Sequence, residues 1–371
     1  MIRNSLGCSV VEAAERRVLD CFNKNEVVCL SFSGGKDSIC TASVVFKTMQ
    51  KYHIPFSRLF VIFVDEEAIY PDIEKICMQW RSKFMAAGSK FYWFCMPFKH
   101  YNCCNRLADD ESFILWEPGK EDRWVRPMPP FAIKNHNDFK WGMTYQAFFN
   151  KVFDKFANIC GVRMSESVQR QSYMTSRKNT DKKVFPLYDW KDSDIWLYIR
   201  DNNLEFPMSY IYMYKTGVPL NRMRISQFFS IDTIKVLPKV LEYYPDLYQR
   251  IVRREPNADL VMLYHDTDMF RSSREDKDFK LDKDYKQMFK EAMREAVKHP
   301  EDYPGYEKVK KTFSNMYDWM SKTVWRLAYQ ILIAGDPKSR THRALILQIN
   351  IEKTEHGKAN AEAAKQRHQE A

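Results

Sequence analysis

The sequence predicts an α/β protein with a doubly wound, mostly parallel sheet and a helical C-terminal extension. Two mainly apolar runs, at residues 27–32 and 59–64, indicate strands that are buried on both faces. Apolar residues recur at helical spacing between these runs. Strands that alternate with helices favour parallel pairing through crossover helices.

The elements are expected in a regular order, with one interruption. Residues 97–150 contain five prolines and three tryptophans among charges, and we interpret them as an insertion over the active-site edge of the sheet. We expect a nucleotide-binding domain at 1–205 and a mainly helical extension at 206–371. The expected helices are 10–22, 39–52, 72–87, 166–177 and one capped by Asp192 or Ser193, and the expected strands are 27–32, 59–64, 91–95, 158–162 and 184–187.

Composition narrows the class of protein. The chain has 371 residues, and 45% of them are hydrophobic, so it can bury a large core. No apolar stretch is long enough for a membrane span, and charges interrupt the N-terminal residues where a signal peptide would lie. We therefore expect a cytoplasmic protein. The net charge of +10 permits binding to nucleotides or nucleic acid without choosing between them.

The loop Ser33-Gly-Gly-Lys-Asp-Ser38 follows the first predicted strand and predicts a phosphate site. Gly34 and Gly35 can adopt positive φ, so successive N–H groups can turn around one anion. Lys36 adds a positive charge, and the next helix offers its N-terminus to the same phosphate. The spacing differs from that of the Walker loop.

Acidic residues 65–67 follow the second predicted strand, at the same edge of the sheet. We expect Asp65 to hold magnesium or ribose hydroxyls, with Glu66 and Glu67 as weaker candidates. A solvated loop is the alternative.

Gly161-Val-Arg163 follows a later strand and leads into Glu166 and Arg170, which have helical i, i+4 spacing. Arginine guanidinium groups suit phosphate or sulfate. A surface ion pair is the alternative interpretation.

Three motifs occur in the order typical of one enzyme group. They are the loop 33–38, the arginine motif that begins at Gly161, and the passage Val184-Phe-Pro-Leu-Tyr-Asp-Trp190. Over about residues 25–205 the chain resembles the PAPS reductase and ATP sulfurylase small-subunit branch of the adenine nucleotide alpha hydrolase superfamily. PAPS is phosphoadenosine phosphosulfate. The resemblance implies that ATP, or PAPS, binds with Mg²⁺. It implies catalytic roles for Lys36, Asp37 and Arg163, a magnesium ligand at Asp37 or Asp65, and nucleotide binding by Ser33, Gly34, Gly35, Lys36, Asp37, Ser38, Asp65, Gly161, Arg163, Glu166 and Arg170.

The cysteines depart from the pattern of this branch. Its thiol-dependent reductases use a C-terminal cysteine, and this chain has none after Cys160. Cys103 and Cys104 precede the arginine motif, and there is no Cys-x-x-Cys. We therefore expect neither PAPS reduction by the chain's own thiol nor an iron–sulfur cluster.

Two further passages resemble the phage- and prophage-borne IbrA-type proteins, which are often paired with a ParB-like partner. They lie in the insertion and after residue 205, and they form a second cationic set beside aromatic residues. Such a set suits an anionic substrate, with nucleic acid among the candidates. Ordinary surface arginines are the alternative. The candidate residues are Arg123, Trp124, Arg126, Arg222 and Arg224.

The sequence thus predicts an ATP-binding enzyme that cleaves the α–β phosphate bond to adenylate an unidentified, anionic acceptor. One alternative is a PAPS-directed enzyme that uses an external thiol. Another is a nucleotide-sensing regulator, or a protein associated with DNA modification, that acts with a ParB-like partner.

Overall fold

The computed structural model describes residues 7–102, 104, 112–164, 182–220, 223–225, 228, 241–264, 284–336 and 339–369. The chain divides into two compact units, Met1–Ser272 and Ser273–Ala371. Each has its own hydrophobic core. This division differs from the boundary expected at residue 205.

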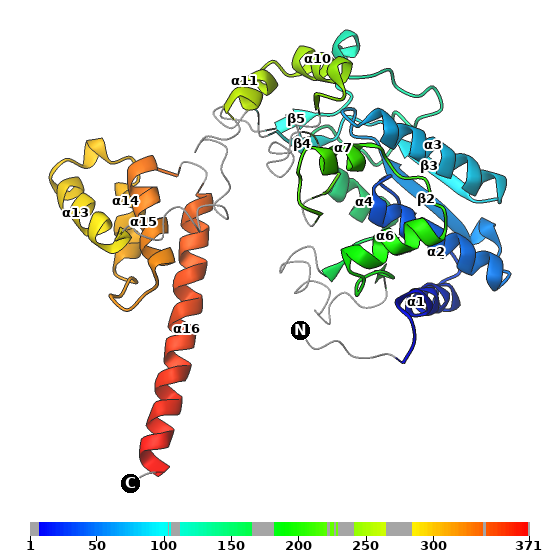
Figure 1. Ribbon diagram of the computed structural model, residues 1–371. Helices are drawn as coiled ribbons and strands as arrows, with labels where there is room; N and C mark the ends of the chain where they lie inside the picture. The colour runs from blue at the N-terminus through cyan, green and yellow to red at the C-terminus, as the bar shows by residue number, and fades with distance from the viewer. Residues whose placement is uncertain are drawn as a thin grey trace. The chain divides into compact units, whose positions relative to one another are not determined.

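Unit 1 contains the sheet and most of the elements (Figure 1). Its strands are β1 (Val28–Ser31), β2 (Leu59–Val64), β3 (Lys90–Phe94), β4 (Lys99–Tyr101), β5 (Ser112–Ile114), β6 (Ala157–Cys160) and β7 (Lys183–Val184). Its described helices are α1 (Val10–Lys24), α2 (Lys36–Lys51), α3 (Pro71–Ala86), α4 (Tyr145–Phe153), α6 (Asp192–Asp201), α7 (Ser209–Lys215), α10 (Pro245–Arg254) and α11 (Asn257–Tyr264).

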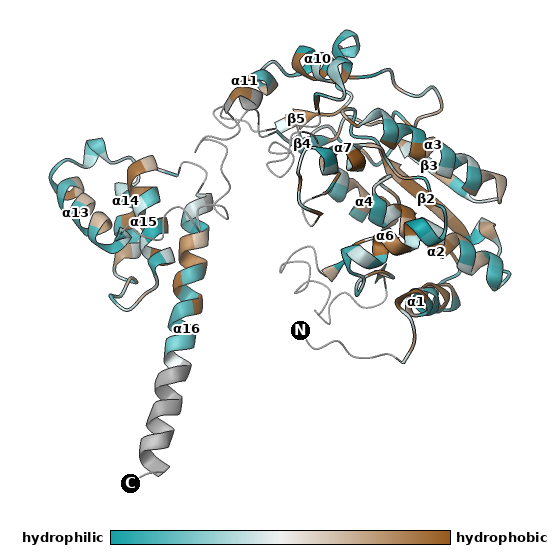
Figure 2. Ribbon diagram, viewed as in Figure 1, coloured by the Kyte–Doolittle hydropathy of each residue, from teal (hydrophilic) through white to brown (hydrophobic). Residues whose placement is uncertain are grey.

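Five strands form a parallel sheet in the order β3-β2-β1-β6-β7. Helices cover both of its faces. Phe46 of α2 packs edge-on against Phe84 of α3, whereas Phe153 of α4 packs against Phe60 on the sheet. Figure 2 shows β2 as hydrophobic along its length, which fits a strand enclosed by helices. The predicted doubly wound α/β fold is confirmed.

The insertion at 97–150 contains structure that the sequence did not predict. β4 and β5 form a separate antiparallel pair, and α4 begins at Tyr145 with Thr144 as its N-cap. Leu115, Trp116 and Val125 of the insertion are buried in the core of unit 1. The insertion is therefore an integral wall of this unit.

Unit 2 is helical in its described part. It comprises α13 (Tyr285–Lys298), α14 (Tyr306–Phe313), α15 (Lys322–Ala334) and α16 (Arg340–Gln369). Its core gathers side chains from these four helices, such as Phe289, Val309, Ile331 and Leu345. Across the described residues of both units, no helix has the length and hydropathy needed to cross a membrane.

Candidate functional site

The candidate site lies where the strand order of the sheet reverses. β1, β2 and β3 succeed one another in one direction, and β6 and β7 lie on the other side of β1. Ligands of open parallel sheets bind at such a switch point, beyond the carboxyl ends of the strands. The loops that begin there are 32–35 after β1 and 161–164 after β6.

A row of backbone N–H groups is available in the first of these loops. Among the described residues, the N–H groups of Gly34, Gly35, Asp37 and Ser38 donate to no acceptor. Gly35 is the N-cap of α2, and as a glycine it has no side chain that could cap the helix. Free N–H groups at the N-terminus of a 16-residue helix can bind an anion.

Two glycines allow the backbone to adopt this shape. Gly34 has φ +74°, and a Cβ there would lie 2.9 Å from both Cys77 Sγ and Ile73 Cγ2. A Cβ at Gly161 would lie 2.7 Å from Thr41 Oγ1. A side chain at either position would therefore displace its neighbours.

Ser33 and Ser38 close the loop on itself. The N–H and hydroxyl of Ser33 lie 3.3 Å and 3.2 Å from Ser38 Oγ, and that hydroxyl donates to Gly35 O at 2.9 Å. The two serines thus hold the loop's shape in this structure.

Four charged side chains meet beside the loop. Lys36 Nζ lies 3.1 Å from Asp37 Oδ2 and 4.0 Å from Asp192 Oδ1. The Arg163 guanidinium pairs with Asp37 and, at 2.8 Å, with Asp192. Burial lowers the pKa of Arg163, but Asp37 and Asp192 outweigh burial, so this pKa lies above its ordinary value.

Residues beyond 205 also reach the loop. Lys36 Nζ donates to the Met223 carbonyl at 3.0 Å, and the Lys36 N–H donates to the Tyr210 hydroxyl at 3.0 Å. Lys36 is 3% exposed as a result. Tyr210, Met223 and Asp192 were not predicted as site residues from the sequence. Asp192 had a detectable signal, since it is an acidic residue that follows the last predicted strand.

Asp65 is completely buried, and both of its carboxylate oxygens have partners. Its carboxylate accepts bonds from the Glu67 N–H (3.1 Å) and Trp93 Nε1 (2.7 Å), and it pairs with Arg126. Arg126 also pairs with Glu74 at 2.7 Å. This partner set favours a structural role for Asp65 and Arg126, which were expected to hold magnesium and to contact substrate.

Glu67 and Glu66 differ in their surroundings. Glu67 is buried and pairs with Arg254 of α10 at 2.8 Å. Glu66 is only partly buried, and among the described residues no donor contacts its carboxylate. Burial, helped by Asp65, raises the pKa of Glu66 to about 7.

The expected substrate-binding set is dispersed. Arg123 is exposed beside Asp122, and Trp124 Nε1 donates to the Glu117 carbonyl. Arg224 is exposed. Neither Arg123 nor Trp124 joins the cluster around Lys36. Glu166, Arg170, Arg222 and Cys103 lie outside the described residues.

The described residues offer no metal centre of their own. Within the described ranges, no three His, Cys, Asp or Glu side chains are placed to hold a metal ion. Asp37 and Asp65 both use their carboxylate oxygens in ion pairs. The two carboxylates expected to bind magnesium are thus already paired with cationic side chains in this structure.

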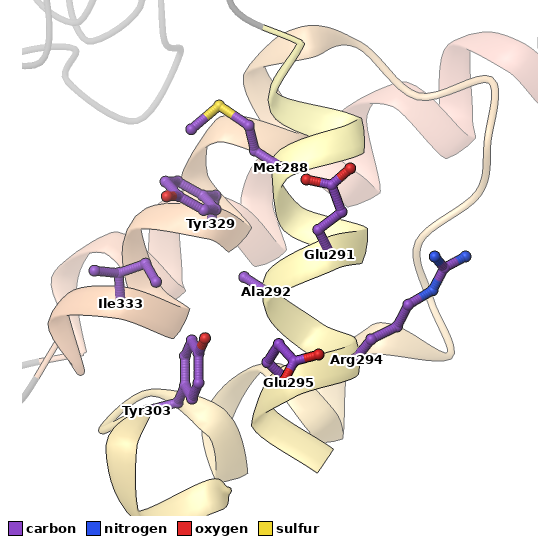
Figure 3. A pocket seen from close by; sticks show the side chains of 8 residues that line it. All are labelled: Met288, Glu291, Ala292, Arg294, Glu295, Tyr303, Tyr329 and Ile333. Atoms are coloured by element: carbon purple, nitrogen blue, oxygen red, sulfur yellow. The ribbon is translucent and has the colours of Figure 1, made fainter. Parts of the chain in front are cut away.

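Unit 2 has a surface hollow of about 450 Å³ (Figure 3). Its acidic side chains already have partners, since Glu291 accepts from Gln287 and Glu295 accepts from Lys298. We assign no function to it. Its walls come from α13, α15 and the turn before α14, namely Met288, Glu291, Ala292, Arg294, Glu295, Tyr303, Tyr329 and Ile333.

Comparison with known proteins identifies one domain. Residues 135–231 match the phosphoadenosine phosphosulfate reductase domain. The match includes Arg163, Asp192 and Tyr210 but not the loop after β1. The resemblance to PAPS reductases that the sequence predicted is thus supported at the level of this domain. The resemblance to the IbrA-type subgroup stays a prediction.

Two curated relatives align with more than half of the chain. The uncharacterized protein YbdN of Escherichia coli K12 is 29% identical over 250 residues, which is 61% of this chain and 60% of YbdN. The uncharacterized protein MJ0973 of Methanocaldococcus jannaschii is 24% identical over 246 residues, which is 62% of this chain and 48% of MJ0973. The chain therefore spans about half the length of the curated relatives it matches.

One solved structure that resembles this chain is the PAPS reductase of Candida auris in its phosphate complex. It is 14% identical with a TM-score of 0.34, and the alignment covers 62% of this chain and 98% of that one.

Proposed function

We propose that unit 1 binds ATP through the loop 33–38 and transfers the adenylyl group to an acceptor. The acceptor attacks the α-phosphorus, the bond from this phosphorus to the bridging oxygen breaks, and pyrophosphate leaves with the bonding electrons. The acceptor is not identified, and we expect it to be anionic. Catalysis of this kind depends mainly on positioning and electrostatics.

The available N–H groups of Gly34, Gly35, Asp37 and Ser38 carry this proposal. N–H groups that lack acceptors and lie close together at a helix N-terminus are suited to bind an anion. Lys36 and Arg163 lie beside this row, where they would stabilise charge on the leaving pyrophosphate. No step is assigned to magnesium.

The test uses ATP labelled in its α-phosphate. We expect pyrophosphate as the product, with label transferred to the acceptor, in mixtures that contain candidate anionic acceptors. Lys36→Gln should abolish pyrophosphate release, whereas the exposed Lys51→Gln should retain it. Production of ADP and inorganic phosphate, or pyrophosphate release that is equal in Lys36→Gln, would contradict the proposal.

PAPS is the second candidate ligand, because residues 135–231 match the PAPS reductase domain. Since the chain has no cysteine after Cys160, this activity would need a thiol from another molecule. Thermal stabilisation separates the two ligands. Stabilisation that requires the 3′-phosphate of PAPS supports this second function, and stabilisation by ATP alone supports adenylyl transfer.

A further inference from the structure

Tyr210 is fixed in place by contacts with two helices. It is the second residue of α7, and the N–H of the preceding Ser209 donates to Asp72 Oδ2 at 2.9 Å. Its ring packs edge-on against Trp196 of α6, with 5.6 Å between the ring centroids. The side chain is 2% exposed. The packing therefore determines where its hydroxyl lies.

That hydroxyl lies against the phosphate loop. It accepts the Lys36 N–H at 3.0 Å, and it would be 3.2 Å from a Cβ at Gly35. It thus lies at the start of α2, close to the loop that holds the available N–H groups of Gly34, Gly35, Asp37 and Ser38.

The hydroxyl also has a proton to donate. Among the described residues, no acceptor receives a bond from it. Burial is the largest cause that raises the pKa of Tyr210 well above its ordinary value, so the phenol keeps its proton at neutral pH. A buried phenol that accepts one N–H close to other unpaired N–H groups can donate its own proton to an acceptor such as a phosphate oxygen.

We propose that Tyr210 is a ligand-binding residue whose hydroxyl donates a hydrogen bond to the phosphate held by the loop 33–38. This inference rests on the proposed phosphate site and adds a side chain from outside the nucleotide-binding motifs. The hydroxyl would accept from the Lys36 N–H and donate to the phosphate at the same time. Helix α7 would thereby form one wall of the site.

The experiment measures the affinity of inorganic pyrophosphate by calorimetry for the full chain and for Tyr210→Phe. Phenylalanine keeps the ring contact with Trp196 and removes only the oxygen. We expect the dissociation constant to rise by about 10- to 150-fold, as for loss of one hydrogen bond to a charged group. Tyr212→Phe is the matched control, because Tyr212 lies on the same helix and stacks on Tyr243. The affinity of Tyr212→Phe for pyrophosphate should equal that of the wild type.

A dissociation constant for Tyr210→Phe equal to that of the wild type would overturn this inference and leave the proposed function standing. Weakened pyrophosphate binding together with ADP as the product from ATP would support Tyr210 and contradict adenylyl transfer. No binding of pyrophosphate by the wild type would contradict both.

A second measurement covers the case in which Tyr210→Phe does not fold. In the wild type, we expect pyrophosphate to shift the NMR signals of the Tyr210 ring and the Lys36 amide. Signals that stay in place while pyrophosphate binds would overturn the inference.

Discussion

At the scale of single residues, the positive and negative side chains around Lys36 are equal in number. Lys36 and Arg163 supply two positive charges, and Asp37 and Asp192 supply two negative charges within ion-pair distance. The cluster is therefore neutral before an anion arrives. A bound phosphate would be stabilised mainly by the N–H groups and the helix N-terminus, with little help from net charge.

This balance makes Asp192 a test of the electrostatics. Asp192→Asn leaves Lys36 and Arg163 opposite one carboxylate and gives the cluster a net positive charge. We expect the affinity for pyrophosphate to increase by about 3- to 10-fold at low salt, and the gain to shrink as salt is added. Calorimetry at two salt concentrations measures both effects. The control is Asp201→Asn, an exposed position on the same helix, which should change neither the affinity for pyrophosphate nor its salt dependence. An unchanged or weaker affinity in Asp192→Asn would be inconsistent with a neutral cluster.

Glu66 predicts a pH dependence of stability. Its pKa in the folded protein is raised to about 7, so the folded state binds this proton more tightly than the unfolded state does. The associated stability is present below about pH 4.5 and is lost as the pH rises to about 7. Glutamine does not ionise, so Glu66→Gln does not lose stability in this way as the pH rises. Relative to the wild type, we expect Glu66→Gln to increase the free energy of unfolding at pH 8 by on the order of 1 to 3 kcal/mol.

Denaturant titrations of wild type and Glu66→Gln from pH 5 to pH 8 measure this difference. The gap between the two proteins should widen with pH. A constant gap would show that Glu66 titrates normally.

Among single residues, the sequence predicted the loop better than its surroundings. The glycines and Lys36 could be predicted as loop residues from their residue types and from their position after a strand. Asp65 was assigned to magnesium because its position at the strand end was readable, but its contacts with Trp93 and Arg126 were not. Those partners lie 28 and 61 residues away along the chain, and no spacing rule connects them.

At the level of elements, the loop between β1 and α2 depends on Gly34. Alanine at this position meets both a positive φ and a close approach to Cys77 and Ile73. We expect Gly34→Ala to lower the free energy of unfolding by about 2 to 4 kcal/mol and to weaken pyrophosphate binding. Gly142→Ala is the control, because Gly142 has φ +80° but a Cβ there would have no heavy atom within 4 Å, so this change should cost only about 1 kcal/mol.

Chemical denaturation and calorimetry of both variants check this prediction. If Gly34→Ala matches Gly142→Ala in stability and keeps wild-type affinity, the loop does not need the observed backbone conformation.

Element boundaries were predicted well where apolar runs mark them. The strand expected at 59–64 is β2 as observed, and the helix expected at 10–22 extends two residues further in α1. The helix expected at 39–52 begins at Lys36, because polar residues form its first turn. The cap expected at Asp192 or Ser193 is Lys191, which leaves Asp192 directed toward Arg163. β4 and β5 were missed, since three-residue strands carry too little pattern.

At the scale of the whole molecule, described residues beyond 205, such as Met213, Leu247 and Ile251, pack into the core of unit 1. Arg254 neutralises the buried Glu67, Tyr244 bonds to Asp72, and Tyr210 contacts Lys36. These long-range pairs have no sequence signature, and for that reason the boundary was expected at 205. A chain that ended there would leave the Glu67 carboxylate without its cation.

We therefore expect residues 1–272 to fold and bind pyrophosphate on their own, and residues 1–205 to remain unfolded or aggregate. Leaving a buried charge unpaired costs about 3 to 5 kcal/mol, which is a large part of the stability of a domain. Circular dichroism during thermal unfolding of the two fragments provides the measurement. Cooperative unfolding of 1–205 would instead support a domain boundary at 205.

A crystal structure of the full chain with ATP tests the phosphate site most directly. We predict that phosphate oxygens lie within hydrogen-bond distance of the N–H groups of Gly34, Gly35, Asp37 and Ser38, at the switch point between β1 and β6. ATP bound elsewhere, with these N–H groups still lacking acceptors, would contradict the central claim that this loop is the nucleotide site.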